Sequence, residues 1–248
     1  ASSSSSSSKR QRGSSGAAVP RVAVPIPPEF DAPLRPPVVP GTVTTRQLTR
    51  ADNGSAFEPR LINGVAADPA SDDEFLATRF GLFRVSPANV VTLLAGSWTN
   101  EEGDVDAVGP AARFRALRRL VPSSDGESLY FCDADTNKVK RLVLATGAVT
   151  TLAGSGEEGD TDGVGAAAQF NYPVGITISP DGRTLFVTDY SNNKVKRVEV
   201  ATGAVTTLAG SGEEGDAAGV GPAAQFNGPS AIPTSPTGTR LSDPSETH

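Results

Sequence analysis

Short apolar runs separated by turn residues fill the centre of this chain, and they are clearest between residues 170 and 210. One run alternates charged and branched apolar residues, which is the two-residue period of a strand with one buried face. Pro180-Asp181-Gly182 and Thr202-Gly203 supply turns between runs. The pattern therefore predicts four short antiparallel strands. The four runs are residues 175–179 (GITIS), 185–188 (LFVT), 194–200 (KVKRVEV) and 204–209 (AVTTLA).

The same pattern recurs at an offset of 56 residues. The sequence ATGAVTTLAGSGEEGD occupies residues 145–160 and returns unchanged at residues 201–216, and NKVKR likewise occurs twice. An eroded copy begins at Phe57, and a further copy begins at Phe226 and breaks off. Such a period marks an internal repeat. The sequence predicts repeats near residues 57–113, 114–169 and 170–225, and a truncated one at 226–248.

A four-stranded sheet of this kind cannot bury both of its faces alone, so the copies must stack on one another. Radial stacking gives a β-propeller, and no long helical pattern favours another repeat architecture. The glycine-rich segments around Asp160 suit long crossovers between sheets. We therefore predict an all-β fold, a β-propeller of four-stranded antiparallel blades, with about three blades and a truncated fourth in an incomplete ring.

The order of the motifs resembles the NHL repeat of β-propellers. Phe-x-x-Pro-x-Gly-Ile, Ser-Pro-Asp-Gly, Leu-Phe-Val-x-Asp, Asn-Lys-Val-Lys-Arg and Val-Thr-Thr-Leu-Ala-Gly follow one another from Phe170 to Gly210. The resemblance is good from Phe114 to Gly154 and weaker from Phe57 to Gly96, where Arg79 stands about where the motif has Asp. It implies a ring of about six blades, hence a longer chain than this one, and a role as an interaction platform. It also implies structural roles for Asp133, Asp189, Asn137 and Asn193.

Residues 1–41 differ in composition from the repeats. A serine run, a small basic cluster (KRQR) and a proline-rich tract offer little apolar surface to bury, so the sequence predicts a disordered tail. Residues 42–248 would then form the partial propeller. The tail is compatible with an organelle transit peptide and equally with a weak nuclear signal, so the compartment stays open.

Overall charge and apolar content exclude some classes of partner. The formal net charge is −6, which argues against nucleic acid as the default partner. No run of about 18 apolar residues predicts a membrane span. The single cysteine, Cys132, aligns with Val187 in a predicted strand, so we expect it to be a buried small apolar residue.

Catalytic constellations are hard to build from this sequence. The only histidine is His248, the last residue, which makes histidine-based catalysis and histidine-bound zinc improbable. A metal-dependent lactonase or esterase of the propeller kind is the competing hypothesis. It needs acidic and amide side chains at inner-strand ends, and the predicted inner strands at 117–121 and 175–179 have none. We therefore expect a non-enzymatic protein without a cofactor.

Acidic crossovers are the best candidate for a cation site. Carboxylate oxygens suit calcium, but the spacing is not that of an EF-hand loop, and solvated acid in a turn is the simpler reading. Ala218 also replaces the second aspartate in the third crossover. The weak calcium candidates are Asp104, Asp106, Asp160 and Asp162.

Basic residues and one tryptophan are the candidate partner contacts. The repeated basic runs would present a cationic stripe to RNA, but no aromatic residues are interleaved with them, so RNA binding ranks below protein binding. Trp98 lies in a lengthened crossover, where contact with a partner and packing on its own blade are equally open. The function predicted is a scaffold that binds a protein partner. The candidate contacts are Trp98, Lys138, Lys140, Arg141, Lys194, Lys196 and Arg197.

An incomplete ring leaves an open blade face at each end. Residues 239–248 do not continue the repeat, and Pro233 and Pro244 would interrupt strand pairing. Residues 42–45 (TVTT) resemble an outer strand, either the strand that closes a ring or the remnant of a lost blade. Two exposed apolar faces favour association. The sequence therefore predicts either that this chain is part of a longer one or that a partner, which can be a second copy, supplies the missing blades.

Overall fold

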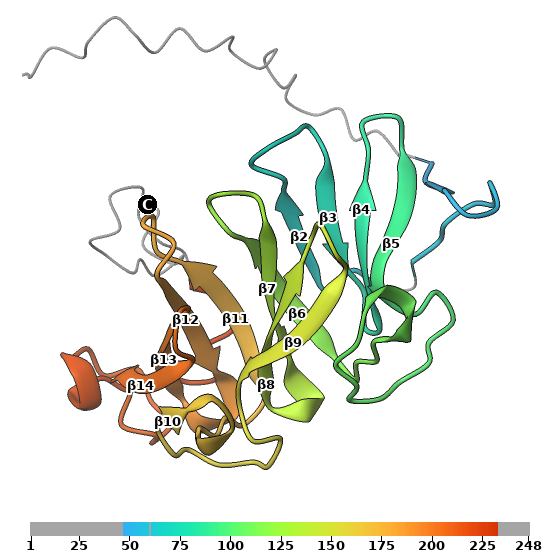
Figure 1. Cartoon of the computed structure of the whole chain (residues 1–248). Coiled ribbons are helices and arrows are strands. Elements are labelled where there is room, and N and C mark those ends of the chain that lie inside the picture. The colour runs from blue at the N-terminus through green and yellow to red at the C-terminus, as the bar shows by residue number, and fades with distance from the viewer. Residues whose placement is uncertain (1–46, 60, 233–248) are drawn as a thin grey trace, which may run out of the picture. The chain divides into compact units, whose positions relative to one another are not determined.

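The computed structural model describes residues 47–59 and 61–232, which belong to one compact unit, Thr45–His248. The predicted disordered tail, the TVTT segment and the residues after Ile232 lie outside this range. Figure 1 shows three antiparallel sheets side by side, and the chain is all-β, as predicted. In the described residues no helix is long and apolar enough to cross a membrane.

Each sheet is a blade whose four main strands follow one another in sequence. Blade 1 contains β2 (Gly64–Ala67), β3 (Glu74–Ala77), β4 (Gly81–Val85) and β5 (Val90–Gly96), with β1 (Thr49–Arg50) added in parallel beside β5. Blade 2 contains β6 (Leu117–Pro122), β7 (Ser128–Asp133), β8 (Lys138–Val143) and β9 (Ala148–Ala153). Blade 3 contains β11 (Pro173–Ile178), β12 (Thr184–Asp189), β13 (Lys194–Glu199) and β14 (Ala204–Ala209), with β10 (Gly163–Val164) beside β14.

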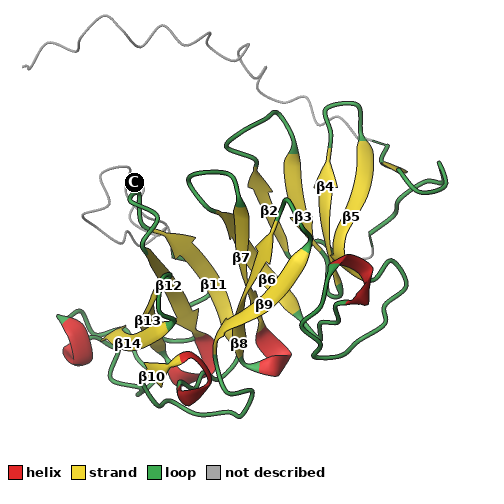
Figure 2. Ribbon diagram, in the orientation of Figure 1, coloured by secondary structure: helices red, strands yellow, loops and turns green. Residues whose placement is uncertain are grey.

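Five single-turn 3₁₀ helices complete the described structure, and Figure 2 shows them in red. Two of them, η2 and η4, connect the second strand of a blade to the third, and the other three lie in crossovers. The four strands predicted for the best repeat agree with β11 to β14 within about two residues. The turns are η1 (Gly109–Ala111), η2 (Ala134–Thr136), η3 (Gly165–Ala167), η4 (Tyr190–Asn192) and η5 (Gly221–Ala223).

The core lies between neighbouring blades. One cluster joins blade 1 to blade 2 through Phe75, Phe114 and Phe131, and a second joins blade 2 to blade 3 through Tyr130 and Phe170. Burial of such aromatic surface is the main favourable term for stacking the sheets. Cys132 is fully buried in the second cluster, which confirms the expectation for this residue, and burial raises the pKa of its thiol.

Short polar side chains hold the connection between the second and third strands. The Asp133 carboxylate accepts hydrogen bonds from the Arg115 and Ala116 amides, and Asp189 accepts one from Asn171. Asn137 adopts the left-handed conformation, and its side-chain oxygen accepts the amide of Tyr172 in the next blade at 2.9 Å. These contacts confirm structural roles at all four motif positions, because Asn193 does the same for Gly228. They satisfy backbone donors that would otherwise be buried without a partner.

In blade 1 this connection is shorter, and the sheet register corrects the sequence alignment. The pairs Ala77–Leu82 and Cys132–Val139 occupy matching places, so Thr78, not Arg79, stands at the motif's aspartate position. Arg79 instead reaches blade 2, where it donates to the Arg115 carbonyl and to Asp135 at 3.2 Å. Sequence offset alone missed this because the connection has lost two residues.

The outward face of blade 1 is partly covered by the chain itself, although Val65 on the same face is 60% exposed. Leu76, Phe83, Val85 and Val91 are buried there, under a layer formed by Leu48, Phe57, Leu93 and Trp98. Leu48 and Phe57 come from the segment around β1 and Trp98 from the crossover after β5, whereas Leu93 belongs to β5 itself. The chain therefore covers part of the outward face of blade 1 with its own residues.

Candidate functional site

Two lysines of the repeated Asn-Lys-Val-Lys-Arg motif are fully buried. The side chains of Lys140 in β8 and Lys196 in β13 have 0% exposure, whereas Lys138 and Lys194 in the same strands are partly exposed. A buried ammonium is stable only if it is paired and hydrogen-bonded. Both lysines meet this condition through the acidic crossover that precedes their own blade.

Around Lys140 the crossover supplies two carboxylates. The ammonium nitrogen lies 2.9 Å from Asp104 Oδ1 and 2.6 Å from Asp106 Oδ1, and 3.2 Å from the Thr151 hydroxyl. Asp106 also accepts the Thr151 amide at 2.6 Å, beside the bulge between β8 and β9. Lys138 binds the other oxygen of Asp104. We call this arrangement a lysine clamp: crossover aspartates bound to the lysines of the following blade.

Blade 3 repeats the clamp with small differences. The Lys196 ammonium lies 3.1 Å from Asp160 Oδ1 and 3.5 Å from Asp162 Oδ1, and it donates to the Gln169 carbonyl at 3.1 Å. Lys194 pairs with Asp160 as Lys138 does with Asp104. Each clamp ties a crossover to the outer strands of its blade.

The clamps change the proton affinities of their members. Burial alone would lower the pKa of Lys140, but hydrogen bonds to Asp106 and Asp104 raise it above the usual value. Burial tends to raise the pKa values of Asp104, Asp106 and Asp160, and the lysines overcome it, so these pKa values lie below 3.8. Asp189, beside Lys196, behaves in the opposite way, because burial raises its pKa to about 6.

These shifts predict a stability maximum on the acidic side of neutrality. Stability from the clamp aspartates is present above pH 3.8 and is lost as the pH falls through their lowered folded-state pKa values. The Asp189 contribution has the opposite sign, because its folded-state pKa is raised: it is complete below pH 3.8 and is lost as the pH rises to about 6.

We therefore expect the melting temperature to rise from pH 7 to pH 5 and to fall steeply below about pH 4. Thermal melts across this range test both limbs. The Asp104→Asn/Asp106→Asn variant should flatten the lower limb, and Asp189→Asn should flatten the upper one. Unchanged limbs in both variants would mean that other groups set the pH dependence.

The clamps correct several sequence expectations. Lysine ammonium groups lie where a cation bound by Asp104, Asp106, Asp160 and Asp162 would lie, so these carboxylates are neither free calcium ligands nor merely solvated. In the described residues no cluster of three or more acidic, histidine or cysteine side chains is arranged for a metal.

The predicted basic stripe is not a single surface. Lys140 and Lys196 face inward and cannot meet a partner in this fold, and Lys138 and Lys194 are largely covered and paired. Arg141 donates to the Ser128 hydroxyl at 2.9 Å, whereas Arg197 is exposed. Of the six basic candidates, Arg197 is the most accessible.

Blade 1 replaces the clamp with aromatic packing. The β4–β5 register puts Phe83 at the place of Lys140 and Leu93 at the place of Thr151. Phe83 contacts Trp98 and Phe57, with ring centroids 4.9 Å apart in both pairs. Trp98 therefore packs on its own blade, and the Arg50 guanidinium lies 4.0 Å from the centre of its ring.

A pocket opens beside this aromatic cluster. Its volume is about 360 Å³ and its walls come from the segment after Phe57, the β3–β4 connection and the crossover after β5. Four aromatic side chains line it, with polar groups at the rim. The lining residues are Phe57, Glu58, Pro59, Leu61, Thr78, Arg79, Phe80, Phe83, Ser97, Trp98 and Asn100.

The sequence carried a signal for the clamps that composition did not reveal. The Asp-x-Asp crossover and the Lys-x-Lys strand occur together in two repeats, and blade 1 lacks both the lysines and the paired threonine. The joint presence of opposite charges at the same spacing in both repeats indicates contact. Treating each charge run separately, as acid in a turn and base on a strand, concealed it.

Comparison with known proteins gives the repeat its context. No protein-family model matches the chain. The chain is 33% identical over 123 residues to human NHL repeat-containing protein 2, and 34% identical over 122 residues to its bovine counterpart. The resemblance to NHL-repeat proteins is confirmed. The NHL-type similarity extends to SUPPRESSOR OF QUENCHING 1, chloroplastic, of Arabidopsis thaliana, at 33% identity over 116 residues.

These NHL-type matches cover only parts of the proteins concerned. They include 44–46% of this chain, and they span 11% of the Arabidopsis relative and 17% of the human and bovine ones. An auxiliary nutrient binding protein from Bacteroides thetaiotaomicron gives a TM-score of 0.55 at 18% identity, over 69% of this chain and 42% of that one. The nidogen/laminin complex gives 0.51 at 13% identity, over 75% of this chain and 59% of that one. At such identities the structures support the fold alone.

Proposed function

We propose that this chain is a protein-binding scaffold whose NHL-type blades hold the Trp98 pocket as a receptor for a large apolar side chain of a partner. The observation that carries the proposal is the replacement of a lysine clamp by a concave aromatic cluster in blade 1 alone. Packing a clamp position requires only one apolar side chain, yet blade 1 gathers four aromatic residues around an open volume. Aromatic pockets of this kind anchor partner side chains in many interfaces.

The arginines near the pocket are already paired with aspartates, which suits an uncharged ligand. Arg79 at the rim is paired with Asp135, and Arg50, which covers one side of Trp98, is paired with Asp52. Their positive charges are therefore largely neutralised. A neutral apolar group can enter such a site without leaving these charges buried and unpaired, so its burial favours binding.

Trp98 provides the test, because it is the chain's single tryptophan. Peptides selected from a phage-displayed random library on the full chain should carry a large apolar residue and should change Trp98 fluorescence saturably. Leu61→Glu places a charge at the exposed rim and should weaken binding about tenfold or more, corresponding to about 1.4 kcal/mol. Val65→Glu is the matched control, because Val65 is equally exposed in the same blade but lies outside the pocket.

Two results would contradict the proposal. One is that selected peptides bind wild type and Leu61→Glu equally and leave Trp98 emission unchanged. The other is metal-dependent turnover by the purified chain in a broad esterase and lactonase screen, which would favour the competing hydrolase hypothesis.

A further inference from the structure

Blade 2 carries three arginines that the two later repeats lack. Arg115, Arg118 and Arg119 stand in and just before β6. The corresponding positions are Asn171, Val174 and Gly175 in blade 3 and Asn227, Ser230 and Ala231 in the repeat after it. Because those positions are uncharged, the repeat does not need the arginines in order to fold.

The inner strand β6 lies between the inner strands of both neighbouring blades. It is the first strand of its sheet, and it packs beside β2 of blade 1 and β11 of blade 3. Arg118 and Arg119 form a bulge, where the pairing with β7 shifts between Leu117 and Leu120. A bulge changes the direction of side chains at a sheet edge. Since blades flank β6 on both sides, the surroundings of Arg118 are complete within the described structure.

Arg118 is a cation without an anion. Its side chain is half-buried, and its Nη2 donates a hydrogen bond to the Tyr172 hydroxyl. Its Nε is buried without a hydrogen-bond acceptor, and no carboxylate pairs with the guanidinium in the part of the chain that the structure describes. Arg113, on the same approach to β6, is paired with Glu101 at 2.5 Å. A partly desolvated charge such as Arg118 is stabilised by an anion that binds to it.

Tyr172 reaches Arg118 from a strained position. Its φ is +56°, in the left-handed region that a bulky side chain rarely adopts, and Gly228 has the same place in the next repeat with φ at +57°. A Cβ at Gly228 would lie 2.8 Å from the Tyr190 ring. Ala134 stands in blade 2 where Tyr190 stands in blade 3, which leaves room for the Tyr172 side chain. Strained residues of this kind are concentrated at functional sites.

Arg118 and Tyr172 present hydrogen-bond donors at one place. The Tyr172 oxygen accepts from Arg118, so its own proton is available to a second acceptor. The guanidinium lies 5.1 Å from the centre of the Tyr172 ring, and the Tyr190 ring packs edge-on against Tyr172 with centroids 6.1 Å apart. Tyr190 is 40% exposed, so this side of the pair is accessible. A guanidinium beside a phenol hydroxyl suits a carboxylate, which accepts a hydrogen bond on each oxygen.

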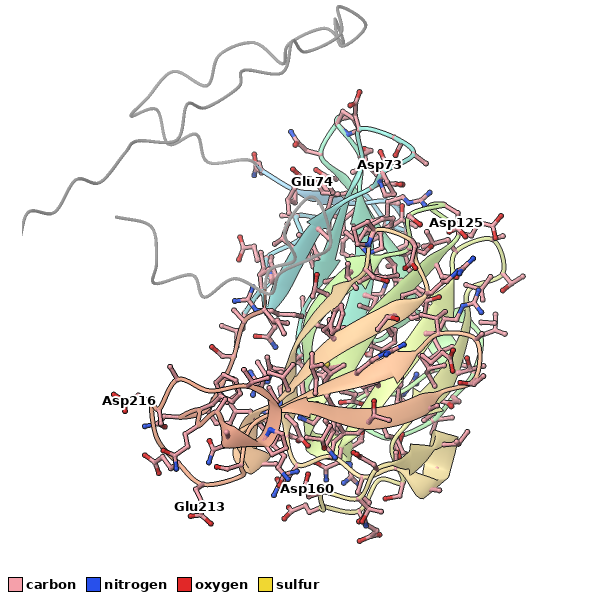
Figure 3. The ribbon with its side chains drawn as sticks, turned by 90° about the vertical axis from the view of Figure 1, so that its left-hand side faces the viewer. Asp73, Glu74, Asp125, Asp160, Glu213 and Asp216 are labelled. Atoms are coloured by element: carbon pink, nitrogen blue, oxygen red, sulfur yellow. The ribbon has the colours of Figure 1, made fainter. Side chains whose placement is uncertain are left out.

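The surrounding charges favour a single carboxylate over a polyanion. Glu102 and Glu158 are exposed, and their backbones bridge to the residues that lead into β6 and β11. Figure 3 shows Asp160 and Glu213 at this end of the blades. A nucleic acid strand would bring its phosphates against these acids. A phosphorylated side chain carries nearly two negative charges, whereas one carboxylate matches the one charge of Arg118.

We propose that Arg118 and the Tyr172 hydroxyl bind a carboxylate of an acidic peptide, with Tyr190 as the exposed wall of the site. The guanidinium donates to the carboxylate from its terminal nitrogens, and the phenol donates its proton in a further hydrogen bond. None of these three residues lines the Trp98 pocket, so this proposal and the proposed function can fail independently.

Selection on the full chain tests the proposal. Random octapeptides, made with free and with amidated C-termini, are screened for those that the wild-type chain retains and Arg118→Gln does not. We expect the peptides to share an aspartate or glutamate. A requirement for the free C-terminus instead would identify the terminal carboxylate as the ligand. Replacing the carboxylate with its amide should weaken binding about tenfold or more.

Arg119→Gln is the matched control, because Arg119 is adjacent, exposed and equally charged. It should weaken the selected peptides by less than about threefold. Tyr172→Phe keeps the ring and removes the hydroxyl, and it should weaken them about fivefold or more. Tyr172→Phe and the amide peptides keep the test decisive if thermal melting shows that Arg118→Gln is destabilised.

Several outcomes would overturn the proposal. One is that no peptide distinguishes the wild-type chain from Arg118→Gln, or that the selected peptides have no carboxylate in common. Another is an equal loss of affinity in Arg118→Gln and Arg119→Gln, which would indicate attraction by net charge alone. Tighter binding of a phosphoserine version of the peptide, or its displacement by an oligouridylate strand, would show that the site takes a different class of anion.

Discussion

Replacing Lys140 with alanine is expected to lower the free energy of unfolding by about 3–5 kcal/mol, because removal of one member leaves buried charge uncompensated. Its ammonium has 0% exposure and binds Asp104, Asp106 and the Thr151 hydroxyl. The crossover would lose its contacts with Lys140 and keep the hydrogen bond from the Thr151 amide to Asp106. Urea-induced unfolding at pH 7 measures the change.

Lys138 provides the internal control for this prediction. It belongs to the same strand and pairs with Asp104, but it is 18% exposed. Lys138→Ala should therefore lower the free energy of unfolding by only about 1 kcal/mol or less. Lys140→Met combined with Asp104→Asn and Asp106→Asn should recover part of the loss, because the opposing charges disappear as well. If Lys140→Ala costs no more than Lys138→Ala, the clamp is not a major source of stability.

Gly154→Ala is expected to lower the free energy of unfolding by about 3 kcal/mol or more. Alanine at this position would have an unfavourable positive φ, and its Cβ would also clash with the backbone. Gly154 directly follows β9 and has φ at +109°, and a Cβ there would lie 2.4 Å from the Asn137 carbonyl oxygen. Asn137 cannot move away freely, since its side chain accepts the Tyr172 amide of the next blade. Thermal melting of the purified variant measures the effect.

Gly165→Ala separates the two causes. Gly165 also has a positive φ, +55°, but a Cβ there would have no neighbour within 4 Å. Its substitution should cost only about 1–2 kcal/mol, the price of the left-handed conformation. Equal losses in both variants would show that the contact with Asn137 is unimportant.

Local sequence pattern was sufficient for the strands and for the stacking of blades. Alternation in residues 194–200 predicted β13, and the turn residues bounded its neighbours, because both signals depend on a few adjacent residues. The motif asparagines were also recognised, since Asn137 and Asn193 occupy left-handed positions that short polar side chains tolerate.

The candidate site was less predictable, because it depends on contacts between distant residues. Lys140 looks like an exposed strand residue until Asp106, from the preceding crossover, is placed beside it. The layer that covers part of blade 1 was missed for a related reason. Leu48 belongs to no recognisable repeat, and only the fold brings it against Phe83 and Trp98.

The order of clamp residues along the chain sets an order in time. Asp104 precedes its lysines by 34 and 36 residues, and Asp160 precedes its own lysines by the same intervals. During synthesis each aspartate leaves the ribosome before its lysines. At a translation rate of about 5–20 residues per second, the lysines follow some seconds later. We expect each crossover to stay loose until the outer strands of its blade have emerged. During synthesis, each completed blade would then fix in place the crossover that precedes it.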